Sequence, residues 1–363
     1  ASDEPEGRRS VGGAAVASVS GTEAIDLGPL RRAPSLREWL AYPRVAGVPW
    51  YGGFLAVSAG AVLAVGASIA AGAVLHTLVG PAAPWFIGVL PAIWAVIAIV
   101  GFVGWLVDAS HRIRLARFAL ANGFAFADRL EGNRRPGLGF PGHLRNIERG
   151  VIAGEHAGTP FQLGRNQSVA RRDAERVDIR KPFAFIQLQL PTEVPHLVLK
   201  NRRSRVLPLA GLGLGNTSRV SLEGNFDTTF TLLCPAGYER DALYILTPNL
   251  MAALLDTASD AEVEFVDDRA TLYFGPRTAL WKPETMAGVF SVIEQLGARL
   301  QRQTARYEDD RAAASATAVA LGGRRILGGD GASGLTIAWF AVMIGISAAV
   351  MGFSFFVAPM LGG

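Results

Sequence analysis

The pattern of apolar and charged positions divides the chain into two kinds of segment. No Asp, Glu, Lys or Arg occurs between Arg44 and Asp108, and a second run without charges follows Asp330 to the last residue. A helix that crosses a membrane needs about 20 apolar residues. The stretch Gly80-Pro81-Ala82-Ala83-Pro84 is a turn that a continuous helix would not tolerate. The pattern therefore predicts three transmembrane helices, at 54–79, 85–107 and 335–360; a buried helical hairpin is the alternative for the first two.

Basic residues flank these runs on one side only. They precede the first run, follow the second and precede the third, at Arg31, Arg32, Arg37, Arg44, Arg112, Arg114, Arg117, Arg324 and Arg325. Basic loops stay on the cytoplasmic side of a membrane. The pattern predicts a protein of the bacterial plasma membrane with its N-terminus and middle segment in the cytoplasm and its C-terminus outside.

The middle segment has the pattern of strands and helices in mixed order. The run "FAFIQLQL" at 183–190 alternates, which predicts a strand with Ile186, Leu188 and Leu190 toward the core and Gln187 and Gln189 outward. A turn at "PTEVP" and a second strand, "HLVLK", are expected next. "VIAGEHAGTPFQLG" predicts a hairpin with a Gly-Thr-Pro turn, and "AEVEFVDDRATLYFG" predicts a hairpin that turns at Asp267-Asp268.

Other runs predict helices or a bend. The range 109–122 reads as a helix, and "VSLEGNFDTTFTLL" as two strands around a Gly-Asn bend. Pro248 follows Thr247, which is a good helix cap, so two helices are expected to meet there, at 241–246 and 248–257. A long amphipathic helix is expected at 284–307. The fold class predicted is an integral membrane protein with three transmembrane α-helices and a cytoplasmic α+β domain that has an antiparallel sheet.

These elements divide the chain into six segments. Ser35 and Glu38 have the spacing of a capping box, which opens a short helix beside the membrane. The divisions are a disordered cytoplasmic tail (1–34), an interfacial segment (35–53), a transmembrane hairpin (54–107), a cytoplasmic α+β domain (108–311), a linker (312–334) and a third transmembrane helix with a short outside tail (335–363).

Composition narrows the classes of function. Half of the 363 residues are hydrophobic and 18% are charged, which fits membrane segments. The net charge of +4 is small for this length and does not favour nucleic-acid binding. The single cysteine, Cys234, excludes an intramolecular disulfide and fits a reducing compartment.

No motif predicts a catalytic, cofactor-binding or metal-binding residue. "GLGLGN" at 211–216 lacks the Lys-Ser/Thr of a phosphate-binding loop, so a linker is favoured. His156 has no partner at metal-ligand spacing and is favoured as an exposed hairpin tip. Cys234 is favoured as a small buried hydrophobe, and Asp267-Asp268 as a β-turn rather than an acid/base pair.

Two basic clusters are candidate contacts for anionic lipid headgroups. One contains acidic residues as well, which favours a solvated loop, whereas the other does not and leaves both interpretations open. Their basic members are Arg165, Arg171, Arg172, Arg176, Arg180 and Lys181 in the first, and Lys200, Arg202, Arg203 and Arg205 in the second.

The range from about 123 to 302 resembles a family of bacterial membrane proteins, the domain of unknown function 3137 family of actinobacterial type. The likeness lies in "NGFAF", in the G-x-x-x-G-x-x-F pattern of Gly154, Gly158 and Phe161, in "FAFIQLQLPTEVPHLVLK", and in "VSLEGNFDTTFTLLCPAGYERDALYILTPNLMAALLD". Members typically have two hydrophobic segments before this domain; the third span and the polar insert at 171–176 are departures. The resemblance implies a fold and a location, and no catalytic residue.

The leading hypothesis is therefore a membrane-anchored cytoplasmic scaffold or binding module, without catalysis or cofactor, that assembles with itself or with another membrane protein. The expected partners are the lipid bilayer, with its anionic headgroups, and a second copy or another membrane protein. One alternative is a membrane-bound enzyme acting on lipid or peptide, in which His156, Cys234 or carboxylates would meet in a pocket. The other is a subunit of a channel or transporter complex.

Overall fold

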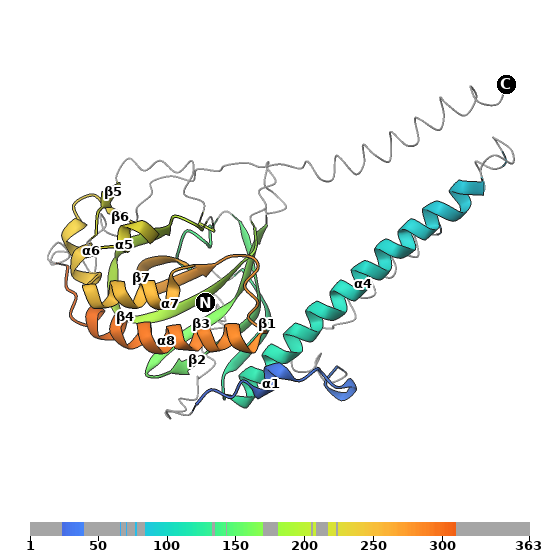
Figure 1. The fold of residues 1–363 in the computed structure, drawn as a ribbon, viewed down its shortest axis with the longest axis horizontal. Coiled ribbons are helices and arrows are strands. Elements are labelled where there is room, and N and C mark those ends of the chain that lie inside the picture. Colours follow the sequence, from blue (N-terminus) through green and yellow to red (C-terminus); the bar gives the residue numbers. More distant parts are fainter. Residues whose placement is uncertain are drawn as a thin grey trace, which may run out of the picture.

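A sheet covered by helices forms the body of the molecule, and one long helix leaves it (Figure 1). The structure is a computed structural model that describes residues 24–39, 84–132, 135–142, 144–169, 181–204, 206–207, 217–222 and 224–309, with single residues at 66, 70 and 77. The glycine-rich run 211–216, the linker and most of the first basic cluster lie outside the described residues.

The sheet has seven strands, and all its described pairs are antiparallel. The long strand β4 is its centre: β7 pairs along one edge of β4, while β3 and then β6 pair along the other edge. The sheet continues from β3 to β2 and β1, and from β6 to β5. The strands are β1 (Ala125–Glu131), β2 (Arg145–His156), β3 (Thr159–Val169), β4 (Phe183–Asn201), β5 (Thr217–Val220), β6 (Phe230–Pro235) and β7 (Glu262–Phe274).

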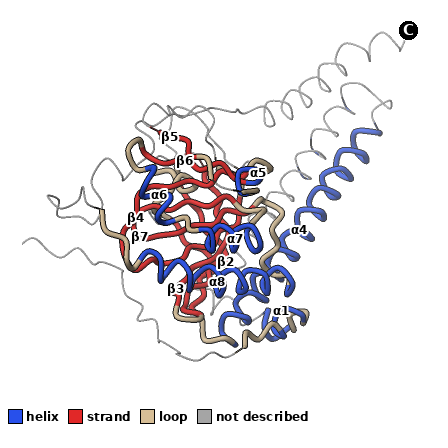
Figure 2. The backbone as a smooth tube through the Cα atoms, turned by 60° about the vertical axis from the view of Figure 1, so that its left-hand side comes forward, coloured by secondary structure: helices blue, strands red, loops and turns tan. Residues whose placement is uncertain are grey.

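Helices cover one face of this sheet (Figure 2). The main core lies between that face and α7 and α8, and it includes Ile186, Leu188 and Leu190 of β4 as the alternation predicted. The described helices are α1 (Gly28–Arg31), α4 (Pro84–Ala121), α5 (Phe226–Thr229), α6 (Glu239–Ile245), α7 (Pro248–Ala258) and α8 (Pro283–Thr304). The predicted long helix is confirmed as α8, which ends three residues earlier than expected.

The joint at Pro248 is confirmed. Helix α6 ends at Ile245, and α7 begins at Pro248. Proline has no backbone N–H, and this costs nothing at the first position of a helix, because that N–H would have no partner within the helix. The Thr247 hydroxyl accepts from the backbone N–H of Leu250 at 3.4 Å, which is the expected cap. The proline therefore starts the second helix, and Leu250, Met251 and Leu254 of that helix reach the core.

Two predicted turns are wrong because the chain passes through them as strand. β4 continues through "PTEVP" and shifts register with β7 between Gln189 and Val194. β7 continues through Asp267-Asp268, where Asp267 has φ 52, a left-handed conformation. The register with β4 shifts on both sides of Asp267, and the extra residues lie on β4. Between β5 and β6, the predicted Gly-Asn bend is present as a turn at Gly224-Asn225, and the short helix α5 follows it before β6 begins.

Helix α4 corrects the predicted fold class. It runs without a break through the uncharged range 85–107 and on through Asp108, Arg112 and Arg114, so the uncharged run is not a separate element. None of the helices in the described part of the chain combines the length and apolarity that crossing a membrane requires. The prediction of an integral membrane protein with three transmembrane helices is therefore wrong; absence of charge was too weak a criterion. The ranges 54–79, except Gly66, Ala70 and Thr77, and 335–360 lie outside the described residues.

Residues 26–38 bind the end of α4 that meets the sheet. The capping box is confirmed: Glu38 accepts from the backbone N–H of Ser35 at 2.6 Å, and Ser35 accepts from that of Glu38 at 3.4 Å. The bond from the Ser35 backbone is the main cause that lowers the pKa of Glu38. Arg117 of α4 binds Glu38 at 3.0 Å and the carbonyl of Pro29 at 3.0 Å, and so attaches both short helical turns to α4.

Candidate functional site

The face of the sheet opposite the helices is covered by the loop 135–142 and buries several polar and charged groups. A second, smaller apolar cluster lies there, built around Phe140, Phe185 and Tyr273. The loop approaches so closely that a Cβ on Gly139 would lie 2.3 Å from the ring of Tyr273. Gly137 has φ 125, which side chains rarely adopt. Glycine is thus required at two points to bring this loop onto the sheet.

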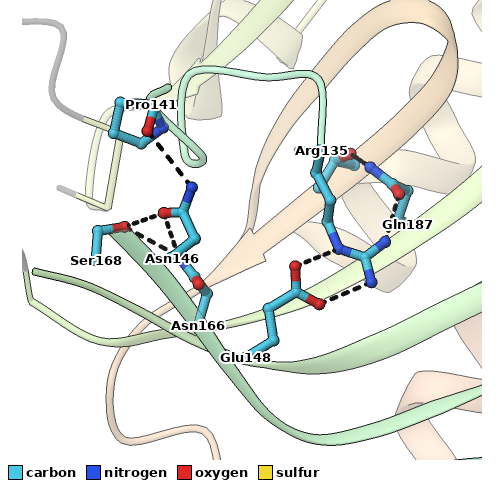
Figure 3. A network of polar contacts seen from close by, with 8 residues as sticks. Arg135, Pro141, Asn146, Glu148, Asn166, Ser168 and Gln187 are labelled. Carbon is cyan, nitrogen blue, oxygen red and sulfur yellow. Dashed lines mark hydrogen bonds and ion pairs between the residues drawn. The ribbon is translucent and has the colours of Figure 1, made fainter. Parts of the chain in front are cut away.

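Arg135 of that loop forms a forked ion pair with Glu148 of β2 (Figure 3). The two N–O distances are 2.7 and 2.8 Å, and a third bond, of 2.8 Å, joins Arg135 to Gln187. Gln187 in turn donates to Thr271 at 3.0 Å. The guanidinium also lies 4.9 Å from the ring centre of Phe185. The prediction that Gln187 faces outward is wrong, because the loop buries it.

Two further buried carboxylates lie along β7. Glu264 accepts from the hydroxyl of Tyr273 at 2.6 Å and from the backbone N–H of Leu138 at 2.9 Å, and its Oε1 lies 2.7 Å from Nε2 of His196. Burial, and then the Glu264 carboxylate, raise the pKa of Tyr273, which keeps that hydroxyl protonated as a donor. Glu262 accepts from Lys200 and from the backbone N–H of Leu207.

A small amide and hydroxyl cluster completes this face (Figure 3). Ser168 donates to Asn146 at 2.7 Å and accepts from Asn166 at 3.0 Å. Asn146 also donates weakly, at 3.4 Å, to the carbonyl of Pro141 in the loop. One buried oxygen, Oδ1 of Asn166, has no partner within the described residues.

The arrangement on this face is that of a polar core. Each of the three glutamates is fully buried and has at least one cationic or N–H partner. A buried charge needs such partners, and a catalytic acid or base also needs a place for substrate. The loop fills that space with Arg135, Leu138 and Phe140. We therefore infer that the polar groups on this face stabilise the fold.

A different charged group lies at the foot of α4, where that helix meets the sheet. We name Arg114 of α4, Arg149 of β2 and Arg165 of β3 the arginine cluster. Arg149 and Arg165 are directly opposite each other across the β2–β3 pair, where like charges destabilise. A Cβ on Gly150 would lie 3.1 Å from Leu115, so β2 passes directly under α4 at this point.

The members of the arginine cluster differ in their partners. Arg165 donates to the carbonyls of Pro276 and Thr278, at 2.8 and 3.1 Å. Arg114 and Arg149 are half-buried, and each has an Nε atom that is buried without a hydrogen-bond partner in the described residues. The nearby Asp108 and Asp128 both pair with Arg112, at 3.4 and 3.3 Å. Arg129 of β1, which also lies opposite Arg149, pairs with Glu131. Five arginines thus lie beside three carboxylates among the described residues.

His111 closes one side of the cluster. Its ring stacks on Trp281 with centroids 3.8 Å apart and an angle of 10° between the planes. Burial, and then the charge of Arg114, lower the pKa of His111, while Asp108 opposes the shift. The imidazole is therefore neutral at pH 7 and adds no positive charge. The cationic character of this region comes from its arginines.

An exposed apolar face of α4 leads directly to the arginine cluster. The half of the helix that leaves the body (Figure 1) exposes Ile93, Val96, Ile99, Val100, Val103 and Val107, each by about half or more of its surface. An exposed apolar patch of this kind on a protein usually marks an interaction site.

The residues weighed from sequence as possible catalytic groups are not brought together. His156 ends β2, where its ring packs against Phe290, whereas Cys234 lies on β6 on the other side of β3 and β4. The prediction for Cys234 is confirmed, since it is fully buried. Burial and then Glu239 raise its pKa to about 11. Asp268 binds Gln189 and Arg269. Within the described residues, no group of three or more His, Cys, Asp or Glu could hold a metal ion.

The sequence patterns indicated only some of the charged residues that form these sites. Arg165 was in a predicted cluster, and Lys200 of the second cluster pairs with Glu262 inside the protein. Arg149 was missed, because its importance depends on lying opposite Arg165, and register is not visible without the bulge at Gly150. β2 contains several charged residues, among them Arg145, Glu148 and Arg149, so no local signal distinguished Arg149.

Comparisons with known proteins give little further information. No family model and no curated protein matches the chain. The crystal structure of the mycobacterial trehalose monomycolate transport factor A, TtfA, is similar over 51% of this chain and 96% of that chain, with 12% sequence identity and a TM-score of 0.34. A likeness of that size carries no argument about fold or function. The resemblance to the domain of unknown function 3137 family stays a prediction, as do the orientation and localisation.

Proposed function

We propose that the chain is a non-catalytic binding module whose arginine cluster and exposed face of α4 together bind an anionic lipid. The observation that carries the proposal is the state of Arg114 and Arg149, half-buried cations whose Nε atoms lack partners in the described residues. Half-buried donors without acceptors are costly. A phosphate from outside supplies the missing acceptors, and guanidinium groups match phosphate oxygens geometrically.

The apolar face of α4 favours a lipid over a free phosphate. Val107 lies seven residues before Arg114, or about 10 Å along a helix, and the face extends about 21 Å further back to Ile93. A lipid whose phosphate contacts the arginine cluster can therefore lay its acyl chains along this face. A small soluble phosphate would leave the apolar face uncovered.

Lipid retention by the full chain tests the proposal. The chain is purified in neutral maltoside micelles doped with phosphatidylglycerol or phosphatidylcholine, and native mass spectrometry counts the lipids retained. We expect phosphatidylglycerol to be preferred, and Arg149→Gln to weaken its retention about tenfold, the value of one charged hydrogen bond. The matched control is Arg203→Gln, at the opposite end of the sheet, which should change nothing. The proposal would be contradicted by equal retention of both lipids or by unchanged retention of phosphatidylglycerol in Arg149→Gln.

Two further arms identify what is bound. Val103→Gln should weaken the retention of lipid without removing the preference for phosphatidylglycerol, because it alters only the acyl-chain contact. Excess inorganic phosphate should not displace the lipid. Complete displacement by phosphate would mean that the arginine cluster binds phosphate groups alone and that the apolar face has another partner.

Self-association through α4 is a second candidate. Ile93, Val96, Val100, Val103 and Val107 are spaced by three, four, three and four residues, which is the seam of a coiled coil. Val100→Glu should then convert a dimer to a monomer in light scattering of the full chain, whereas Arg149→Gln should leave the dimer intact. A wild-type chain that is monomeric at all concentrations would exclude this candidate.

A further inference from the structure

A second polar site lies at the far end of the sheet from α4, near β5 and β6 (Figure 1). It is a cavity of about 290 Å³, and its polar lining comes from Arg202, Arg219, Ser221, Asp227 and Thr231. Arg202 follows β4, Arg219 lies in β5 and Ser221 directly follows that strand, Asp227 belongs to α5, and Thr231 to β6. Three separate stretches of chain thus meet around one small space.

In this cavity the carboxylate of Asp227 accepts hydrogen bonds within the protein, whereas the two guanidinium groups form no ion pair with the described residues. Asp227 accepts from the Ser221 hydroxyl through one oxygen and from the backbone N–H of Leu222, at 3.1 Å, through the other. Arg219 makes one long bond, of 3.3 Å, to the Thr231 hydroxyl. Within the described residues, neither Arg202 nor Arg219 forms an ion pair.

The backbone around the cavity fixes these side chains at their roots. The N–H of Arg202 donates to the carbonyl of Thr229 at 3.0 Å, which ties the end of β4 to the end of α5. Arg219 lies opposite Leu233 in the β5–β6 pair. Because Thr231 accepts its bond from Arg219, its own hydroxyl hydrogen is available for a ligand.

We infer that this cavity binds a small soluble phosphate monoester, with its phosphate between Arg202 and Arg219. Two guanidinium groups and a hydroxyl donor are the residue types that bind phosphate oxygens. The volume lies at the lower end of the range for small-molecule sites, which suits a phosphate with a few attached atoms. The lining is mostly polar, which favours a soluble ester over a lipid headgroup. The Asp227 carboxylate weakens the binding by repulsion and so limits the charge that the site accepts.

Calorimetry on the full chain in a phosphate-free neutral maltoside buffer tests this inference, with glycerol 3-phosphate and inorganic phosphate as probes. We expect saturable binding that Arg202→Gln and Arg219→Gln each weaken about tenfold, since each removes charged hydrogen bonds. Arg203→Gln is the matched control and should bind as the wild type does. Asp227→Asn should tighten binding, because it removes a negative charge next to the anion.

Several results would overturn the inference. The first is the absence of saturable binding by the wild type, and the second is unchanged binding by both the Arg202→Gln and the Arg219→Gln chains. The third is weaker binding by Asp227→Asn, because that loss would indicate a cationic ligand. Stronger competition by phosphatidylglycerol in the micelles than by glycerol 3-phosphate would assign the site to lipid instead. Arg149→Gln should leave this binding unchanged, so that the outcome is independent of the proposal for α4; its loss in that variant would place the phosphate at the arginine cluster and refute the inference.

Discussion

Two regions of the molecule each hold arginines in contact with β2. They are the face of the sheet under the loop 135–142 and the foot of α4. They differ in the partners that the arginine has within the protein. On the first, Arg135 makes a forked pair with Glu148 and a third bond to Gln187, all within the protein. At the second, Arg149, the next residue of the same strand, faces Arg165, and its buried Nε has no acceptor in the part of the chain that the structure describes. Neighbouring residues of one strand point to opposite faces, so β2 separates an internally satisfied charge from the one at which we propose that an external anion binds.

Breaking the satisfied pair should have the largest effect. Glu148→Gln keeps the shape of the side chain but leaves the Arg135 guanidinium buried beside a neutral group. We expect the free energy of unfolding to fall by about 3–5 kcal/mol, measured by urea denaturation. The double variant Arg135→Met with Glu148→Leu should recover most of that loss, because it removes both charges together. A loss below about 1 kcal/mol for Glu148→Gln would show that the pair is not buried as described.

The close approach of the loop should give the next largest effect. Gly139→Ala places a methyl group where it would lie 2.3 Å from the fully buried Tyr273 ring, which cannot move away. We expect a loss of about 1–3 kcal/mol by the same measurement. Gly142→Ala is the control, since nothing lies within 4 Å of its added Cβ. Equal stability of the two variants would contradict the tight packing of this loop.

The buried thiol supplies a pH dependence of intermediate size. Burial raises the pKa of Cys234 to about 11, so the folded chain holds this proton at pH values where an unfolded thiol has lost it. The contribution is fully present below the ordinary thiol pKa of about 8.5 and is lost as pH rises toward 11. Between those values the wild type should lose about 2–3 kcal/mol more than Cys234→Ala does. Parallel pH profiles for the two chains would contradict a raised pKa.

Removing the unsatisfied charge should have the smallest effect on stability. Arg149→Gln deletes a cation that faces Arg165, and the relief of that repulsion offsets the lost packing of the side chain. We expect the free energy of unfolding to change by no more than about 0.5 kcal/mol. A loss of several kcal/mol would mean that Arg149 has an internal structural role, like Arg135.

The sequence predicted the parts of this fold that depend on local pattern. The joint at Pro248, the capping box at Ser35 and the core-facing alternation of Ile186, Leu188 and Leu190 are all present. Each of these features is set by residues a few positions apart. That is the range over which capping, turn chemistry and strand alternation act.

The failures are features that depend on distant residues. Gln187 was assigned to solvent because nothing local indicates that the loop containing Arg135 covers it. Asp267-Asp268 has the residue types of a turn, but both residues lie within β7, which pairs with the distant strand β4. The transmembrane prediction rested on long uncharged apolar runs and the basic residues that flank them, which do not show that one helix runs on through charged residues. The arginine cluster could not be recognised because the pairing of Arg149 with Arg165 is a fact of register.

The adjacent variants Glu148→Gln and Arg149→Gln, each measured for unfolding free energy and for retention of phosphatidylglycerol, test the central claim most directly. The first should lose several kcal/mol of stability, as above, and keep its lipid whenever it is folded. The second should keep its stability and lose about tenfold in lipid retention. If Arg149→Gln retained lipid as the wild type does, or lost stability as Glu148→Gln does, the division of β2 into a structural and a binding face would be wrong.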